Sequence, residues 1–315
     1  MKFTNLFEMI NKIKTEQQAI KYFVKIRWNK QITCPHCNNL GAYNLKNEGK
    51  NFKCKSNKCN KLFSYKTGTI FENTKVSMRK WFLAIYLHAS HKKGISSYQL
   101  MRDLKITQKT AWFMLHRIRE VMKDLNINLE GVVEIDEAYL GGKAENMHMS
   151  KRIQARGIYK KVAVLGMIER NGKVKATKIN DTKANTLKTE IYNTVKEHSL
   201  IITDELNAYK NISNSYNHQS VNHSAGEYVK EFVFENRKSG RQAYKIHTNN
   251  IENFWSHMKR GIYGIYHFIT EKHSQAYIGE FQYRWNSKDS NEGERFDNVL
   301  LKSLNKRLTY SRLIA

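Results

Sequence analysis

Long apolar runs are absent from this sequence of 315 residues. No stretch approaches the ~18 consecutive apolar residues of a membrane-spanning helix, and the start, MKFTNLFEMINK, lacks the uninterrupted apolar core of a signal peptide. Internal repeats and low-complexity segments are also missing. The 40% hydrophobic content, with five Trp and 17 Tyr, nevertheless supplies enough material for packed cores. We therefore expect a folded cytoplasmic protein that has no membrane partner.

Acidic residues are scarce, with 28 Asp and Glu against 54 Lys and Arg, for a formal charge of +26. The imbalance is uneven, because residues 1–127 hold 25 basic and 7 acidic residues whereas residues 128–315 hold 29 and 21. Such an excess suits nucleic acid or an anionic membrane surface. A basic surface that serves only solubility fits less well with a charge concentrated in the first two-fifths of the chain. Nucleic acid is the expected partner.

Cysteine is limited to four residues, which form the two close pairs CPHC and CKSNKC: Cys34, Cys37, Cys54 and Cys59. Two such pairs, sixteen residues apart, are typical of a tetrahedral zinc site in which each pair forms a knuckle. Disulfides are the alternative, disfavoured in the cytoplasm. Four thiolates leave no open coordination position, so we predict structural Zn²⁺ in a ribbon over residues 28–70. His36, inside the first knuckle, is not needed as a ligand.

Helical patterns flank the predicted ribbon. Residues 1–27 read as one or two short amphipathic helices. Between Ser77 and Met122 the segments SMRKWFLAIYLHAS, SSYQLMRDL and TQKTAWFMLHRIREVM predict helices, the last capped by Thr107. The last two, separated by a tight turn, resemble a helix-turn-helix, so we predict a DNA-binding region over 75–127. An ordinary helical hairpin is the alternative. The expected DNA contacts from the second helix are Lys109, Arg117 and Arg119.

After Gly131 the pattern becomes mixed α/β. VVEID predicts a strand, and the pair Asn171-Gly172 between two apolar runs predicts a hairpin. An amphipathic helix through Leu187 and Ile191 follows, and then SLIITDE, a short strand that ends in acid. Residues 207–246 have a weak pattern, for which we expect irregular structure with one or two strands. NNIENFWSHMKRGIYG predicts a further helix.

Three acids lie at the ends of these elements. Asp136 and Asp204 each close an apolar strand, where a carboxylate emerges at the edge of a sheet, and Glu252 begins the later helix. Converging carboxylates suit Mg²⁺, and two such ions about 3.5 to 4 Å apart support an in-line phosphoryl displacement. Taken singly, each residue has an ordinary explanation, because Asp caps turns and Glu begins helices.

At these residues the sequence resembles a known family. EIDEAYLGGK, TDELNAY, NHSAGEYV and HTNNIENFWSHMKRGIYGIYH are similar to motifs of the DDE transposases of bacterial insertion sequences, in the branch with an N-terminal zinc ribbon. The resemblance covers nearly the whole chain. It implies an α/β catalytic core, a ribonuclease H-like mixed sheet with helices over residues 130–300, preceded by the zinc ribbon and the helix-turn-helix-like region. Residues 301–315 would form a C-terminal tail.

The resemblance also assigns roles. Asp136, Asp204 and Glu252 become the three acids that bind catalytic Mg²⁺ or Mn²⁺. Lys259 matches a family lysine, and its position seven residues after Glu252 places it on the same helix face, suited to a phosphate. We expect Arg260 beside it to contact DNA.

Several matches leave open choices. Some relatives carry Asn at the third-acid position, so Glu137 or Glu280 is an alternative third carboxylate. His223, His247 and Asn249 match family positions whose roles do not follow from the residues.

The implied reaction has no covalent protein intermediate. An activated water cuts at the element's end, and the exposed 3′-hydroxyl attacks target DNA. The expected partners are double-stranded DNA, both element ends and target, and a second copy of the chain in a homodimer on DNA. The resemblance also implies a location in the cytoplasm of a bacterial cell, nucleoid-associated when bound. Tyrosine or serine recombination would instead need a nucleophile poised by basic residues. Seventeen tyrosines leave that alternative open by composition, but no Tyr has such a setting beyond chance.

Three rival readings remain. One is a metal-dependent nuclease on the same fold, which cuts and never joins. Another is a non-catalytic zinc-ribbon DNA-binding regulator, which acids at all three matched positions disfavour. The third is a zinc-ribbon module that binds protein, which the basic front end disfavours.

Overall fold

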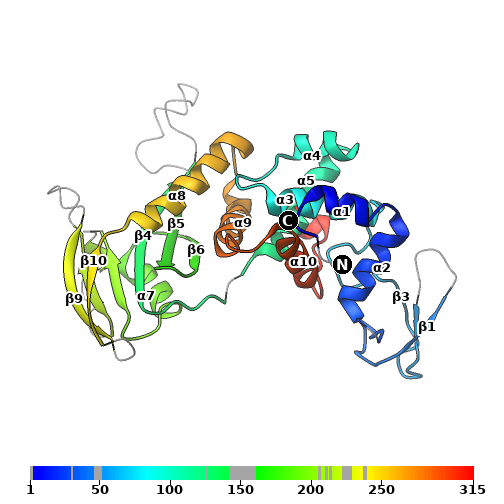
Figure 1. The fold of residues 1–315 in the computed structure, drawn as a ribbon, viewed down its shortest axis with the longest axis horizontal. Helices are drawn as coiled ribbons and strands as arrows, with labels where there is room; N and C mark the ends of the chain where they lie inside the picture. The colour runs from blue at the N-terminus through cyan, green and yellow to red at the C-terminus, as the bar shows by residue number, and fades with distance from the viewer. Residues whose placement is uncertain are drawn as a thin grey trace. The chain divides into compact units, whose positions relative to one another are not determined.

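The chain divides into two compact units in a computed structural model, which describes residues 3–29, 31–45, 52–124, 126–141, 161–204, 207–209, 212, 215–221, 229–236 and 240–315. One unit comprises Met1–Met122 with Ser287–Ala315, and the other comprises Lys123–Asn286 (Figure 1). Within the described ranges, no helix is long and apolar enough to cross a membrane.

The first unit is mainly helical. Its helices are α1 (Leu6–Lys12), α2 (Glu16–Trp28), α3 (Met78–Ser90), α4 (Ser97–Leu104), α5 (Gln108–Met122), α10 (Glu292–Lys302) and α11 (Tyr310–Ile314). Helix starts follow the caps written in the sequence: Thr15 forms a capping box with Gln18, and the Ser77 hydroxyl accepts from the Lys80 amide. Thr107 caps α5 by accepting from the Thr110 amide. The predicted helices at the front of the chain are therefore confirmed.

The ribbon lies between α2 and α3. Its strands are β1 (Ala42–Asn44), β2 (Phe52–Cys54) and β3 (Leu62–Phe63), paired antiparallel in that order. Its apolar core is small: the rings of Trp28, Phe52 and Phe63 lie with their centroids 5.2 to 6.1 Å apart. So few buried side chains rarely hold a fold alone, which leaves the metal to do so.

The C-terminal segment belongs to this first unit. Phe296 of α10 packs against Phe3 at 5.2 Å and Phe82 at 5.1 Å between ring centroids, and the Tyr22 hydroxyl donates to Asp297 at 2.6 Å. The catalytic region was expected to run to residue 300, but the second unit ends at Asn286. The difference arises because α10 buries its apolar side among the N-terminal helices.

The helix-turn-helix-like pair is α4 and α5, joined through Lys105 in the left-handed conformation (φ 48°). From Met114 to the end of α5 every residue except Glu120 is buried. Arg117 is 7% exposed and Arg119 is 1% exposed. The Arg117 guanidinium donates to the carbonyl oxygens of three residues: Ile70 (2.7 Å), Glu72 (3.1 Å) and Leu308 (3.1 Å).

These positions correct the prediction that Arg117 and Arg119 contact DNA. The basic residues of the second helix suggested DNA contacts, but neighbouring segments cover the two arginine side chains. Of the three residues predicted to contact DNA from this helix, Lys109 in the first turn is the exposed one. Its ammonium lies 4.9 Å from the centre of the Tyr310 ring.

The second unit is built on a five-stranded mixed sheet with the order β6-β5-β4-β7-β8. The strands are β4 (Val132–Leu140), β5 (Val162–Glu169), β6 (Val174–Ile179), β7 (Leu200–Thr203) and β8 (Asn217–Ser220). β5 pairs antiparallel with β4 and β6, whereas β7 runs parallel to β4 and β8. The hairpin at Asn171 (φ 59°) is confirmed, as is the α/β architecture.

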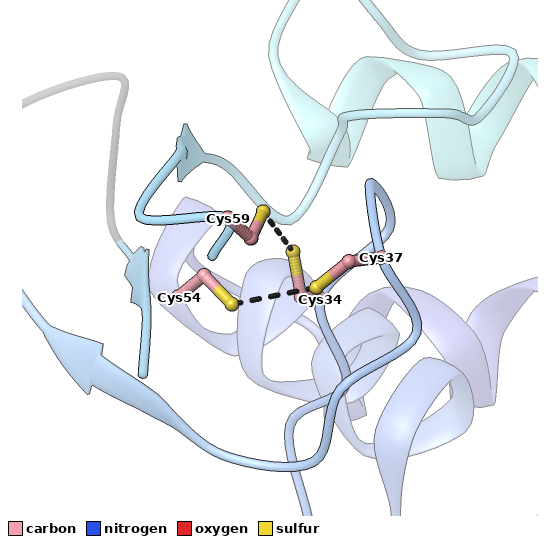
Figure 2. A group of neighbouring side chains, drawn as sticks. All are labelled: Cys34, Cys37, Cys54 and Cys59. Atoms are coloured by element: carbon pink, nitrogen blue, oxygen red, sulfur yellow. Dashed lines mark hydrogen bonds between the residues drawn. The ribbon is translucent and has the colours of Figure 1, made fainter. Parts of the chain in front are cut away.

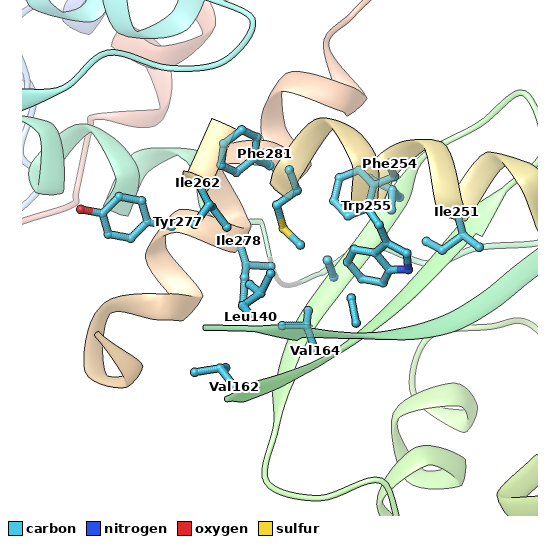
Figure 3. Packing of buried hydrophobic residues seen from close by; sticks show 14 of the residues in the cluster. Leu140, Val162, Val164, Ile251, Phe254, Trp255, Ile262, Tyr277, Ile278 and Phe281 are labelled. Atoms are coloured by element: carbon cyan, nitrogen blue, oxygen red, sulfur yellow. The ribbon is translucent and has the colours of Figure 1, made fainter. Parts of the chain in front are cut away.

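Helices cover both faces of this sheet. The remaining elements are α7 (Ala184–Tyr192), η2 (Asn207–Tyr209), β9 (Lys230–Asn236), β10 (Gly240–Ile246), α8 (Asn249–Gly261), η3 (Ile262–Tyr266), η4 (Glu271–His273) and α9 (Ser274–Asn286). α8 and α9 pack on the face that presents Ala138 and Leu140 (Figure 3), and α7 packs on the face that presents Val133 and Ile135. Residues 207–246, expected to hold one or two strands, hold β8 and the hairpin β9–β10.

Removing the Arg117 guanidinium should destabilise the first unit. We expect Arg117→Ala to lower its free energy of unfolding by roughly 2 to 4 kcal/mol, because three carbonyls lose a charged donor in a buried place. Hydrogen exchange of the α5 amides in the full chain measures this. Arg102→Ala, on the exposed surface of α4, is the control and should change exchange little; equal effects of both substitutions would contradict the assigned role.

Candidate active site and metal centres

Two acids meet at one edge of the sheet because their strands are neighbours. β4 and β7 are parallel, with Glu134 opposite Ile202, so continuing the register by two residues places Asp136 level with Asp204. Carboxylate oxygens of Asp136, Glu137 and Asp204 all lie within 4.8 Å of one another. Three hard oxygen donors at this spacing fit a divalent cation.

The Asp136 carboxylate is held by two donors. Its Oδ1 accepts from the backbone N–H of Glu137 at 2.8 Å, and its Oδ2 accepts from the indole N–H of Trp255 at 2.9 Å. Burial raises the pKa of Asp136 to about 6, and the negative charges of Asp204 and Glu252 act in the same direction. A carboxylate with this environment is a better cation ligand than an exposed one, since a bound cation relieves the repulsion.

Glu137 joins the cluster from the other face of β4. The hydroxyl of the buried Tyr209 donates to it, and burial raises the pKa of Glu137 to about 7 despite that hydrogen bond. Glu137 was kept from the sequence as an alternative third acid, and the geometry places it beside the two aspartates.

The other two candidates for the third acid lie differently. Glu252 is exposed in the first turn of α8, accepts from the Thr248 hydroxyl at 3.0 Å, and is close enough to raise the pKa of Asp136. Glu280 is fully buried in α9, paired with Arg284 and hydrogen-bonded by Tyr266. Those partners give Glu280 a role inside the core, whereas Glu252 stays within electrostatic range of the cluster.

A fully buried carboxylate, Glu134, fixes the start of α8. Its oxygens accept from the backbone N–H groups of Asn250 (2.9 Å) and Ile251 (3.2 Å) and from the Asn250 side chain (2.7 Å). The N-cap Thr248 makes no side-chain cap bond, so Glu134 caps the helix from the neighbouring strand. Arg170 neutralises it at 2.9 Å and donates to the carbonyls of Lys245 (2.6 Å) and His247 (3.2 Å).

The remaining predicted residues divide by location. Lys259 is half-buried, seven residues after Glu252 on the uninterrupted α8, and Arg260 is exposed and donates to Ser256. His247 lies 3.5 Å from Glu134 and its Nδ1 faces the Asn249 amide at 3.4 Å, so both belong to the start of α8. His223 lies outside the described residues.

Glu134, Tyr209 and Trp255 were missed in the sequence. A signal existed for Glu134, which shares a face of β4 with Asp136 at the two-residue period of a strand. Trp255 follows Glu252 by three residues on the helix, and its place in an apolar stripe concealed its polar contact.

The four cysteines form a second centre in the first unit (Figure 2). The Sγ atoms of Cys34 and Cys59 are 3.9 Å apart, those of Cys37 and Cys54 are 3.6 Å apart, and all four sulfurs lie within 4.8 Å. A tetrahedral ZnS₄ site requires about 3.8 Å between sulfurs, whereas a disulfide requires about 2 Å. The thiols are free, so the disulfide alternative is excluded and the set fits structural zinc.

Each of the two clusters lies within a domain that matches a known family. Residues 128–286, half of the chain, match the ISXO2-like transposase domain, and residues 14–62 match the transposase zinc-ribbon domain. An uncharacterized protein in transposable element ISH50 of Halobacterium salinarum is 27% identical over 239 residues, covering 70% of this chain and 79% of that protein.

Zinc removal should unfold the ribbon and spare the sheet of the second unit. We expect one zinc per chain by metal analysis, and loss of hydrogen-exchange protection at the β1–β3 amides after chelation, because the aromatic core there is small. Cys37→Ser should lose zinc, whereas His36→Ala in the same knuckle should keep one equivalent. Loss of zinc from His36→Ala, or none bound by the wild type, would contradict the assignment.

The cluster of acids should weaken the metal-free second unit as pH rises. The pKa of Asp136 in the folded state, about 6, lies above its ordinary value of 3.8, so the folded state binds the proton more tightly and loses stability as pH climbs through this window. Asn cannot ionise. We therefore expect the stability of Asp136→Asn relative to wild type to rise by about 1 to 2 kcal/mol between pH 4 and pH 8.

The measurement is urea unfolding without Mg²⁺ or Mn²⁺, with zinc retained. Asp181→Asn is the control, since hydrogen bonds from Thr186 and the Lys183 amide lower the pKa of Asp181 and its substitution should shift the pH dependence in the opposite sense. A relative stability of Asp136→Asn that does not change with pH would refute the raised pKa of Asp136.

Proposed function

Since this chain belongs to the ISXO2-like transposase family, we propose that it cleaves the ends of its insertion sequence by metal-dependent hydrolysis and joins the 3′-hydroxyl ends to target DNA by DDE-type catalysis. The observation that carries the proposal is the convergence of Asp136, Glu137 and Asp204 carboxylates within 4.8 Å at one edge of the sheet. Three carboxylates at this spacing repel one another, and a bound divalent cation would offset that repulsion.

The donor set favours Mg²⁺ or Mn²⁺, because it offers only carboxylate oxygens. When bound, these ions supply Lewis-acid stabilisation of the phosphate and of the attacking and leaving oxygens. Asp136 and Asp204 are the proposed primary ligands. The third is Glu252 by resemblance or Glu137 by proximity.

The protein's own groups position the DNA. Lys259, on the same helix as Glu252, supplies positive charge to a phosphate near the acids, and the exposed Arg260 continues that basic surface. Two donors hold Asp136, and Tyr209 holds Glu137, so neither carboxylate has to reorganise when the phosphate arrives.

Recognition of the element ends falls to the first unit. Residues 1–127, which include its ribbon and helix-turn-helix-like pair, carry 25 basic and 7 acidic residues, and helices of this kind read bases from their N-terminal turn. Lys109 is exposed in that turn of α5. Since two ends have to be joined in concert, we propose a homodimer on DNA.

The chemistry is tested with labelled element ends, target DNA and Mg²⁺ or Mn²⁺. We expect the wild type to give cleaved and joined products, and Asp136→Asn and Asp204→Asn to lose at least about a hundredfold in rate while still binding DNA. Asp181→Asn, an acid of the same unit outside the cluster, should keep its activity. Glu137→Gln and Glu252→Gln are then compared. The third acid is the one whose substitution lowers the rate as much as the two aspartate substitutions do.

Other outcomes of this assay would favour a different function. Cleavage without joined product favours a nuclease on the same fold. Binding that weakens steeply with salt, with no metal-dependent chemistry, favours a DNA-binding regulator.

A further inference from the structure

Trp255 is an indole placed between α8 and the sheet with its one polar atom on a catalytic candidate. It is 4% exposed, packs in the cluster formed by α8, α9 and the sheet (Figure 3), and donates from Nε1 to Asp136 Oδ2 at 2.9 Å. A buried indole N–H usually finds a hydrogen-bond acceptor. Here the acceptor is the carboxylate proposed to hold the metal.

Gly166 makes room for this contact. It lies opposite Asp136 in the β4–β5 pair, and a Cβ at that position would approach two atoms of the Trp255 ring at 2.4 and 2.5 Å and Ile251 Cδ1 at 2.9 Å. Real Cβ atoms essentially never lie closer than 3.0 Å to another heavy atom of this kind. The glycine is therefore explained by the space that the indole occupies and not by its backbone conformation.

The two hydrogen bonds to Asp136 leave it competent to bind a cation. The Glu137 amide uses one lone pair of Oδ1, and the indole uses one of Oδ2. A carboxylate oxygen has two lone pairs, so each oxygen keeps one. The indole thus fixes the orientation of the Asp136 carboxylate and still leaves lone pairs with which it can bind a cation.

The contact also links the proposed catalytic groups. Trp255 lies three residues after Glu252 and four before Lys259 on α8. Its hydrogen bond therefore connects the helix that carries both residues to Asp136 on β4. We propose that Trp255 is a positioning residue for the reaction: its N–H sets the orientation of Asp136 and the register of α8 against the site, in a space left by Gly166. This inference rests on the proposed function.

Trp255→Phe tests the role, because it keeps an aromatic ring in the core and removes the donor. Outer partners of metal ligands contribute about ten- to a hundredfold to metal affinity, so we expect the variant to need about tenfold more Mg²⁺ for half-maximal strand joining. Trp285→Phe is the matched control: Trp285 packs against the same cluster, and its substitution also removes an indole. It should leave the Mg²⁺ requirement unchanged.

A spectrum of the indole N–H groups reports the bond without any reaction. Among the signals of the five tryptophans, the one absent from Trp255→Phe belongs to Trp255, and it should move in Asp136→Asn, in Gly166→Ala and on addition of Mg²⁺. A signal that stays in place in Asp136→Asn overturns the inference, even if Trp255→Phe fails to fold.

The two proposals fail separately. Wild-type protein that joins strands, with Trp255→Phe and Trp285→Phe showing the same Mg²⁺ requirement, overturns the positioning role alone. Wild-type protein that joins nothing overturns the proposed function and, with it, the positioning role of Trp255 in the reaction, while the indole spectrum still decides whether the bond to Asp136 exists.

Discussion

The second unit depends on how α8 is attached to β4. The attachment is polar at two places: Glu134 caps the N-terminus of the helix, and Trp255 donates to Asp136 about a turn and a half further along. Both acceptors lie on the same face of the strand, two residues apart. Burying the charge of Glu134 is costly in isolation, but Arg170, two backbone amides and the Asn250 side chain satisfy it. Helix and strand are therefore held in one register, which apolar packing alone would leave free to slide.

The pairing of β4 with β7 explains how the mutually repelling acids stay close to one another. Asp136, Glu137 and Asp204 are fixed by the pairing of β4 with β7, and apolar clusters on both faces hold the sheet in place. The raised pKa values of Asp136 and Glu137 show that burial and repulsion oppose their charged forms. Burial in the core thus offsets the unfavourable repulsion between the acids at the edge of the sheet. On the proposed function, a bound cation would relieve that repulsion.

Sequence patterns predicted the parts whose causes are local. Cysteine spacing gave the ribbon, Asn171-Gly172 gave the hairpin, and acids at strand ends gave Asp136 and Asp204 as partners. Features that depend on distant segments were not accessible. The burial of Arg117 depends on carbonyls of Ile70 and Leu308, and the domain boundary depends on Phe296 packing against Phe3. Trp255 reads as core because a helical stripe does not reveal that a glycine on β5 admits its ring.

The distribution of arginine and lysine bears on how the first unit would hold DNA. Arginine forks serve its interior: Arg27 donates to the carbonyls of Tyr65 and Thr67, and Arg117 and Arg119 are buried. Most of the remaining basic residues there are lysines, which bind phosphates as point charges and lack the bidentate geometry that reads guanine. On the proposed function, the overall charge would then give salt-dependent affinity for any duplex. On the same proposal, side chains exposed around the first turn of α5, such as Lys109, would contribute selectivity for the element ends.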